Sequence, residues 1–197
     1  MLMTRLKSLF SGPRAWPVEC FGKLPCYQDY VSLVTSRGAT RWRDWLLSTY
    51  RGETLPPEGV WRFVFESQQH GEPVVGLIQA SSDGRREFPF SLFVVGDPRL
   101  LRSPAALTAV WEELAALHWQ LIAVPDIQGI YTCCAGRKVS LDPAAVSEKE
   151  AQTLRPDSGR WPRLLVAAPG NGGALQLLWQ AGMEPAALDR NWQALKV

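Results

Sequence analysis

The sequence lacks an apolar run long enough to cross a bilayer, and it lacks a strong excess of charge of either sign. Crossing a membrane takes roughly 20 consecutive apolar residues, whereas Arg5 and Lys7 already interrupt the first ten positions. Lysine and arginine number 21 against 19 for aspartate and glutamate, a net charge of +2. Surfaces that bind nucleic acid are strongly basic. We therefore expect a cytoplasmic protein with no stable membrane insertion and no nucleic-acid partner.

Cysteine and histidine are scarce, at four and two residues. Cys20 and Cys26 are six positions apart and Cys133 and Cys134 are adjacent. Neither pair has the two-residue spacer of a zinc or thioredoxin-like motif, and the two histidines supply few further ligands. The spacings predict reduced cysteines inside the fold and no metal site.

Recognisable catalytic motifs are also missing. The chain contains no Gly-x-Ser-x-Gly, no His-Glu-x-x-His, no phosphate-binding loop and no dinucleotide fingerprint, so we expect no cofactor. The glycine-rich residues 170–173 are interpreted as a hairpin turn, because no lysine and serine or threonine follow them. A nucleophilic thiol such as Cys26 beside His70 or His118 stays open, since catalytic groups are assembled in space. Otherwise His118 is expected to pack or to form a hydrogen bond.

What the chain does contain is a series of apolar segments between Trp61 and Gly96. Along the last segment we expect four side chains on one face and two on the other: Phe88, Phe90, Leu92 and Val94 against Phe93 and Val95. A strand with two apolar faces lies inside a sheet and needs cover on both sides. Asp83 and Gly84 predict a hairpin turn, which makes the second and third segments antiparallel neighbours.

Helices and strands are predicted on either side of this region. We expect helices over residues 40–50, 104–121, 142–154 and 188–195, the second capped by Ser103. We expect an edge strand that begins at Val18 and leads into a loop by Tyr30, and further strands over residues 127–134, 163–168 and 174–180. The order predicts one αβα layered domain over residues 18–197 with a mixed, largely antiparallel central sheet, after an N-terminal extension of residues 1–17. Residues 1–10 are amphipathic, which leaves a contact with a membrane or a partner open.

Polar side chains gather at the ends of the buried strands. They are Ser81, Ser82, Asp83, Arg85 and Arg86, joined by Lys23 and Asp29 on a loop that follows an edge strand beginning at Val18. Turn residues between strands are normally solvated charges. If Asp83 or Asp29 instead binds Arg86, the arginine is fixed to orient a loop or to receive an acidic partner.

Several of these residues belong to a series of motifs. Five blocks occur in one order: Phe21-Gly22-Lys23-Leu24-Pro25, Asp29-Tyr30-Val31, a tryptophan helix around Trp45, Trp61-Arg62-Phe63, and Ser82-Asp83 with Arg86-Glu87-Phe88-Pro89-Phe90. In these blocks the chain resembles the TagF/ImpM family of type VI secretion accessory proteins, most strongly over residues 20–96. Gln28 and Arg85 stand where the family has glycine, and the spacing from Asp83 to Arg86 is one residue shorter than in the family.

The resemblance implies an αβα fold, a cytoplasmic location and no catalytic activity. It implies a post-translational regulator, often a repressor, that binds a forkhead-associated-domain scaffold protein or another type VI secretion component. The matching positions expected to form or support the binding surface are Lys23, Asp29, Ser82, Asp83 and Arg86. The matching positions expected to be structural are Gly22, Pro25, Trp45, Trp61, Phe88 and Pro89.

Two functions of other classes stay open. One is a hydrolase or transferase with an unrecognised nucleophile, for which Cys26 and Ser82 are the candidates. The other is a structural subunit of the secretion baseplate. The sequence names neither the partner, nor the sign of the regulation, nor the oligomeric state.

Overall fold

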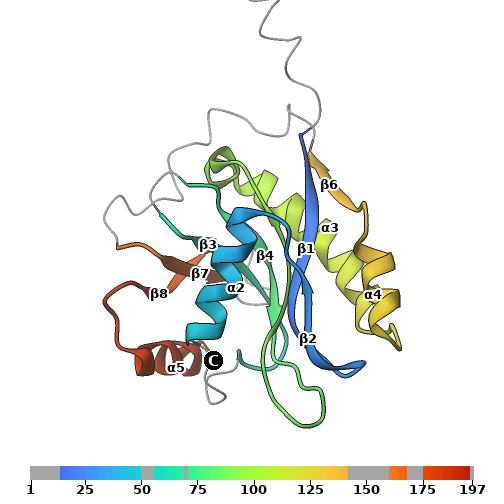
Figure 1. The fold of residues 1–197 in the computed structure, drawn as a ribbon. Coiled ribbons are helices and arrows are strands. Elements are labelled where there is room, and N and C mark those ends of the chain that lie inside the picture. The colour runs from blue at the N-terminus through green and yellow to red at the C-terminus, as the bar shows by residue number, and fades with distance from the viewer. Residues whose placement is uncertain (1–13, 50–55, 69–70, 142–159, 168–174, 196–197) are drawn as a thin grey trace, which may run out of the picture.

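The computed structural model of the 197-residue chain describes residues 14–49, 56–68, 71–141, 160–167 and 175–195. The amphipathic residues 1–10, the predicted helix 142–154, the glycine turn 170–173 and His70 lie outside the described residues. The described part forms one sheet with helices on both sides (Figure 1).

Eight strands of the described residues form this sheet, and each of their pairings is antiparallel. They are β1 (Arg14–Leu24), β2 (Tyr27–Leu33), β3 (Val60–Glu66), β4 (Val74–Gln79), β5 (Phe90–Val95), β6 (Lys138–Leu141), β7 (Arg163–Ala167) and β8 (Gln176–Gln180). Their order is β2-β1-β5-β4-β3-β7-β8, and β6 pairs with the first residues of β1 (Figure 1). The predicted largely antiparallel sheet is confirmed, with no parallel pair among the described strands.

The three predicted apolar segments form β3, β4 and β5, and β4 lies between the other two. Phe90 and Leu92 of β5 face one helical layer and Phe93 faces the other, as the alternation predicts. Phe88 departs from the prediction because it packs on the face opposite to Phe90. The physical reason is that Phe88 and Pro89 precede β5, so the period of two does not extend back to them.

The strand β1 lies inside the sheet, between β2 and β5, so the predicted edge strand after Val18 is wrong. Within the described sheet β2 and β8 end the strand order, and β6 is a further edge strand that pairs only with β1. Gly22 and Pro25 are typical of an edge, but Pro25 follows the strand and Gly22 allows a close approach to the chain at Pro89. β1 begins at Arg14, within residues 1–17, and its first four residues pair with β6.

The described helices are α2 (Arg37–Thr49), the short 3-10 helix η1 (Pro98–Arg102), α3 (Pro104–Leu121), α4 (Ile127–Cys134) and α5 (Pro185–Ala194). Helices α2, α3 and α5 confirm the predictions for residues 40–50, 104–121 and 188–195. α3 begins as predicted, because Ser103 Oγ accepts a hydrogen bond from Ala106 N at 3.2 Å and Pro104 follows. No helix in the described part of the chain combines the length and hydrophobicity needed to cross a bilayer.

Residues 127–134 form the helix α4, so the predicted strand is wrong. Asp126 Oδ1 caps this helix by accepting a hydrogen bond from Gly129 N at 2.7 Å. The buried residues Ile130 and Cys134 are one turn apart and share a face. In a short apolar run the helical and strand periods are hard to separate, and here the aspartate cap decides between them.

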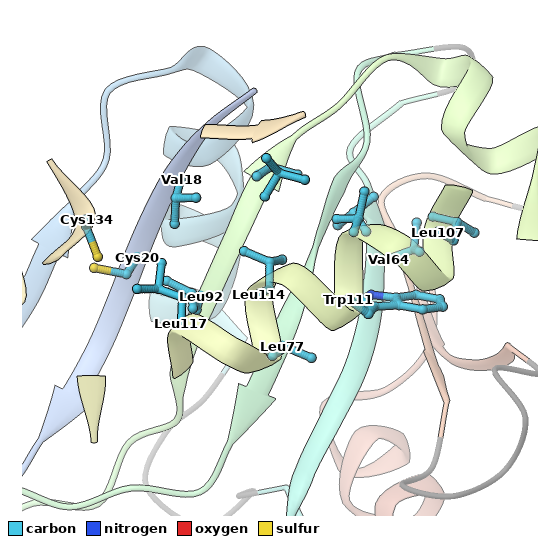
Figure 2. Close-up of a cluster of buried hydrophobic side chains, with 14 of the residues drawn as sticks. Val18, Cys20, Val64, Leu77, Leu92, Leu107, Trp111, Leu114, Leu117 and Cys134 are labelled. Atoms are coloured by element: carbon cyan, nitrogen blue, oxygen red, sulfur yellow. The ribbon is translucent and has the colours of Figure 1, made fainter. Parts of the chain in front are cut away.

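Two hydrophobic cores lie on opposite faces of the sheet. The first lies under α3 and α4, where Trp111, Leu114 and Leu117 pack on the sheet (Figure 2). The second lies under α2 and α5, where Trp42 stacks on Phe63 with ring centroids 4.4 Å apart. Helices thus cover both faces, and the predicted αβα layering is confirmed.

Candidate functional site

The turn between β4 and β5 carries the polar residues singled out in the sequence. Asp83 Oδ1 accepts hydrogen bonds from Arg85 N at 2.9 Å and Arg86 N at 2.7 Å. Ser82 Oγ accepts one from Gly84 N at 3.0 Å, and Gly84 has φ +83°. Side-chain oxygens therefore satisfy the amides of this turn, which gives it one defined conformation.

Lys23 reaches this turn from β1. Its Nζ lies 2.8 Å from Asp83 Oδ2, and both side chains are fully excluded from solvent. The hydrogen bond from Lys23, followed by those from the amides of Arg86 and Arg85, holds the pKa of the Asp83 carboxyl far below its usual value. The predicted loop position of Lys23 is wrong, because the residue lies on β1 and its ammonium is buried against a carboxylate; that Lys23 supports a binding surface stays a prediction.

Two further groups complete the arrangement. The Gln28 carbonyl oxygen accepts hydrogen bonds from Lys23 Nζ at 3.1 Å and from Arg86 Nη2 at 2.8 Å. The Tyr30 ring lies 4.5 Å from Lys23 Nζ and 5.9 Å from Arg86 Cζ, within the range of cation–π attraction. We call these five residues the Lys23–Asp83–Arg86 cluster: Lys23, Gln28, Tyr30, Asp83 and Arg86.

Arg86 is the exposed member among the charged residues of the cluster. Its side chain is 57% exposed, and its Nη2 lies 3.7 Å from Asp83 Oδ2. The Tyr30 ring is itself supported by Phe21 at 5.4 Å and Phe88 at 4.9 Å. Much of the guanidinium therefore faces solvent while a carbonyl, a carboxylate and an aromatic ring limit its movement.

A glycine brings β1 close enough to place Lys23 at the turn. A Cβ atom on Gly22 would lie 2.1 Å from the Pro89 oxygen and 2.6 Å from Phe90 Cα. Next to this point the buried Ser91 Oγ donates a hydrogen bond to the Phe21 oxygen at 3.0 Å. Gly22 and Pro89 thus set the spacing between β1 and the chain leading into β5.

The other predicted residues lie apart from the cluster or only support it. Asp29 is exposed, and its Oδ1 accepts a hydrogen bond from Tyr30 N at 2.8 Å. Ser82 holds the turn, and Pro25 is exposed between β1 and β2. Trp45 and Trp61 lie in the core under α2 and α5.

Sequence reasoning missed Gln28 and Tyr30 as members of the site. Gln28 takes part through its backbone carbonyl, which any residue supplies, so its side chain carries no signal. Tyr30 stands in one of the motif blocks. Its aromatic ring would indicate a cation–π contact only if Lys23 and Arg86 were already known to lie close together.

The family assignment rests on the N-terminal part of the chain. Residues 19–125, more than half of the sequence, match the model of the TagF N-terminal domain, which is type VI secretion system-associated. The chain belongs to the TagF family. All five residues of the Lys23–Asp83–Arg86 cluster fall within the matched TagF region, whereas β7, β8 and α5 follow it.

Comparison with solved structures finds a weak similarity to a crystal structure. PA0076 from Pseudomonas aeruginosa PAO1 is 19% identical, with 90% of this chain and 77% of that chain covered and a TM-score of 0.39. No curated protein sequence matches the chain significantly.

The surroundings of Cys26 and His118 in this TagF-family chain do not activate a nucleophile. Burial raises the pKa of the Cys26 thiol, whereas an activated cysteine has a lowered pKa. Among the described residues, neither ring nitrogen of the buried His118 has a hydrogen-bond partner. Of the two predicted roles, packing and hydrogen bonding, His118 therefore has the packing role. No group of three or more potential metal ligands occurs in the described part of the chain.

Acid should destabilise the folded protein through His118. Burial lowers the pKa of its ring from 6.5 to about 4, so the unfolded chain binds a proton more tightly than the folded one. The stability is therefore lost as the pH falls from 6.5 towards 4. Between pH 7 and pH 4.5 we expect this group to lower the free energy of unfolding by about 2 kcal/mol, measured by urea denaturation at both values.

His118→Leu is the control, because leucine has a similar volume and binds no proton. The carboxylates and His70 are the same in both proteins. The difference between their changes in the free energy of unfolding from pH 7 to pH 4.5 is therefore the contribution of the His118 ring. The same pH dependence in wild type and variant would contradict the assignment of this proton to His118.

Proposed function

We propose that this TagF-family protein is a non-enzymatic, cytoplasmic regulator of type VI secretion that acts by binding another protein. The observation that carries the proposal is the fixed, exposed guanidinium of Arg86 within a TagF N-terminal domain. A held arginine loses less side-chain entropy on binding than a free one does. The held Arg86 guanidinium therefore suits the recognition of a partner protein more than it suits catalysis.

The proposed partner carries acidic groups at the contact. Arg85 and Arg86 are both exposed on the turn, and Lys23 and Asp83 neutralise each other beneath them. The turn thus presents two exposed guanidinium groups beside the single exposed carboxylate of Glu87, a net charge of +1 above a nearly neutral support. A carboxylate accepts two parallel hydrogen bonds from a guanidinium, which fixes orientation as well as affinity.

The partner we propose is the one implied by the resemblance. It is a forkhead-associated-domain scaffold protein of a threonine-phosphorylation pathway, or another secretion component in its place. Binding would repress assembly of the secretion machinery after translation of its components.

The enzymatic alternative rests on Cys26 or Ser82, and the surroundings of both favour the binding function. The Cys26 thiol has a raised pKa, and the Ser82 hydroxyl is used as an acceptor within the turn. Broad activity-based labelling tests this alternative, since a single stoichiometric modification at either residue would support an enzyme. Size-exclusion chromatography of cell extracts separates a transient regulator from a permanent baseplate subunit.

Arg86→Ala should weaken binding to the type VI secretion partner by about tenfold or more, because a central arginine commonly contributes strongly to an interface. Asp83→Ala should weaken it as well, since Arg86 loses its carboxylate support. Affinity would be measured by calorimetry with the partner recovered by pull-down from the native cell extract.

Arg190→Ala is the matched control for this experiment. Arg190 lies on α5, is 64% exposed and has a loose ion pair with Glu184 at 3.9 Å, close to the exposure and ion-pair distance of Arg86. We expect its affinity to equal that of wild type. Unchanged affinity for folded Arg86→Ala and Asp83→Ala would remove the turn from the interface, and failure of the wild type to retain any secretion component would overturn the regulatory function.

A further inference from the structure

Two cysteines that are far apart in the sequence meet in the core under α3 and α4. Cys20 lies on β1 and Cys134 ends α4, and both are buried, at 0% and 1% exposure. Figure 2 shows their sulfur atoms pointing toward each other. Both are free thiols, and a hydrogen bond joins them.

The backbone around the two thiols fixes their approach. Val18 N donates a hydrogen bond to the Arg137 oxygen at 3.0 Å, and Arg137 N donates one to the Cys134 oxygen at 3.0 Å. Pro17 pairs with Lys138 at the start of β6. The turn from α4 to β6 is therefore fastened to β1 two residues before Cys20.

The two thiols differ in acidity in a way that suits a stepwise reaction. Their hydrogen bond raises the pKa of Cys20 and lowers that of Cys134, and the charge of Arg137 lowers the latter further. The positive charge of Arg137, three residues after Cys134, favours a thiolate at Cys134, and the thiolate is the nucleophilic form.

A small cavity lies beside the two segments that carry this pair, although neither cysteine lines it. A cavity of about 90 Å³ is lined by residues that include Val18, Leu117 and Arg137. Val18 and Leu117 belong to the same core cluster as both cysteines. Hydrogen peroxide is only slightly larger than water and could enter such a cavity, which would bring it to Val18 and Arg137, on the segments that hold the two thiols.

We propose that Cys20 and Cys134 are an oxidisable dithiol that closes to a disulfide in the presence of hydrogen peroxide. The Cys134 sulfur attacks one peroxide oxygen, the O–O bond breaks, and one water leaves after proton transfer, which makes Cys134 a sulfenic acid. The Cys20 sulfur then attacks the Cys134 sulfur, the S–O bond breaks, and the second water carries away the Cys20 proton. Two thiols are oxidised by two electrons in all, and one peroxide is reduced to two waters.

The disulfide would join α4 covalently to the strand that carries Lys23. It would close a loop from residue 20 to residue 134, and a long closed loop restricts the unfolded chain strongly. For a chain of this size we expect the melting temperature to rise by about 5 to 10 °C.

Intact mass spectrometry tests the proposal on the full chain. The protein is reduced, freed of reductant, treated with hydrogen peroxide and alkylated. We expect a mass loss of about 2 Da, the two thiol hydrogens, with two fewer alkylation sites and a digest peptide that links Cys20 to Cys134. Reductant should reverse the mass change and the rise in melting temperature.

Two variants define the pair. The double variant Cys26→Ala and Cys133→Ala should still lose about 2 Da, whereas Cys134→Ala should not. Absence of the loss in wild type, or a digest that links Cys20 to Cys26 or Cys133, would overturn the proposal. The digest is made on wild type, so the test stands even if Cys134→Ala does not fold.

Discussion

Arg163→Met should lower the free energy of unfolding by about 3 to 5 kcal/mol. Arg163 of β7 and Glu66 of β3 pair across the sheet, and their side chains are 3% and 2% exposed. Glu66 Oε2 lies 2.5 Å from both Nε and Nη2 of Arg163. The variant leaves a buried carboxylate without this guanidinium, and an uncompensated charge in a dry site is costly. Urea denaturation at pH 7 measures the change.

The double variant Arg163→Met and Glu66→Leu is the matched control. It removes both charges and replaces them with apolar side chains, a change that is often nearly neutral. We expect it to recover at least half of the stability lost in Arg163→Met. A double variant that is less stable than the single variant would show that the charges themselves stabilise the β3–β7 contact.

Gly22→Ala should lower the free energy of unfolding by about 3 kcal/mol or more. The added methyl group would lie 2.1 Å from the Pro89 oxygen, and φ at Gly22 is +136°, where side chains are disfavoured. Because backbone atoms oppose the methyl group, relief requires β1 to move away from the chain at Pro89. That movement would also draw Lys23 away from Asp83. Chemical denaturation measures the stability.

Gly84→Ala separates these two causes. Gly84 also has a positive φ, +83°, but nothing lies within 4 Å of the place where its Cβ would stand. Gly84→Ala should therefore lower the free energy of unfolding only through the unfavourable backbone conformation, by about 1 to 2 kcal/mol, without a steric clash. Equal losses in the two variants would contradict the close contact as the reason for Gly22.

The sheet could be predicted because its residues follow simple periods. Leu92 and Phe93 fall on opposite faces of β5, as alternation requires, and the Asp83-Gly84 pair marks the turn between β4 and β5. In α3 the cap at Ser103 and the proline after it define the first turn locally. Such features depend on neighbours within a few positions, so the sequence carries them in readable form.

The errors arose where local pattern and tertiary packing disagree. Residues 127–134 are too short for their period to separate helix from strand, and the Asp126 cap decides for the helix. Phe88 breaks the alternation because Pro89 delays the start of β5. Lys23 is charged, so a surface position was the natural expectation, but Asp83 from another segment neutralises it in the interior.

The site shows the same division. The motif blocks name Lys23, Asp83 and Arg86, and all three converge, whereas Asp29 stays apart. The point of convergence is a backbone carbonyl, that of Gln28, together with the Tyr30 ring. A carbonyl is common to every residue, so its role depends on position alone.

The sequence by itself determined the TagF family, the antiparallel sheet, and the helices α2, α3 and α5, because family motifs, periods and caps are written in consecutive residues. Tertiary structure alone decided that Lys23 is buried, that Arg86 is the exposed charge of its cluster, and that Cys20 faces Cys134. Each of these depends on which distant segments meet, and the energies of burial and ion pairing are set only after they do.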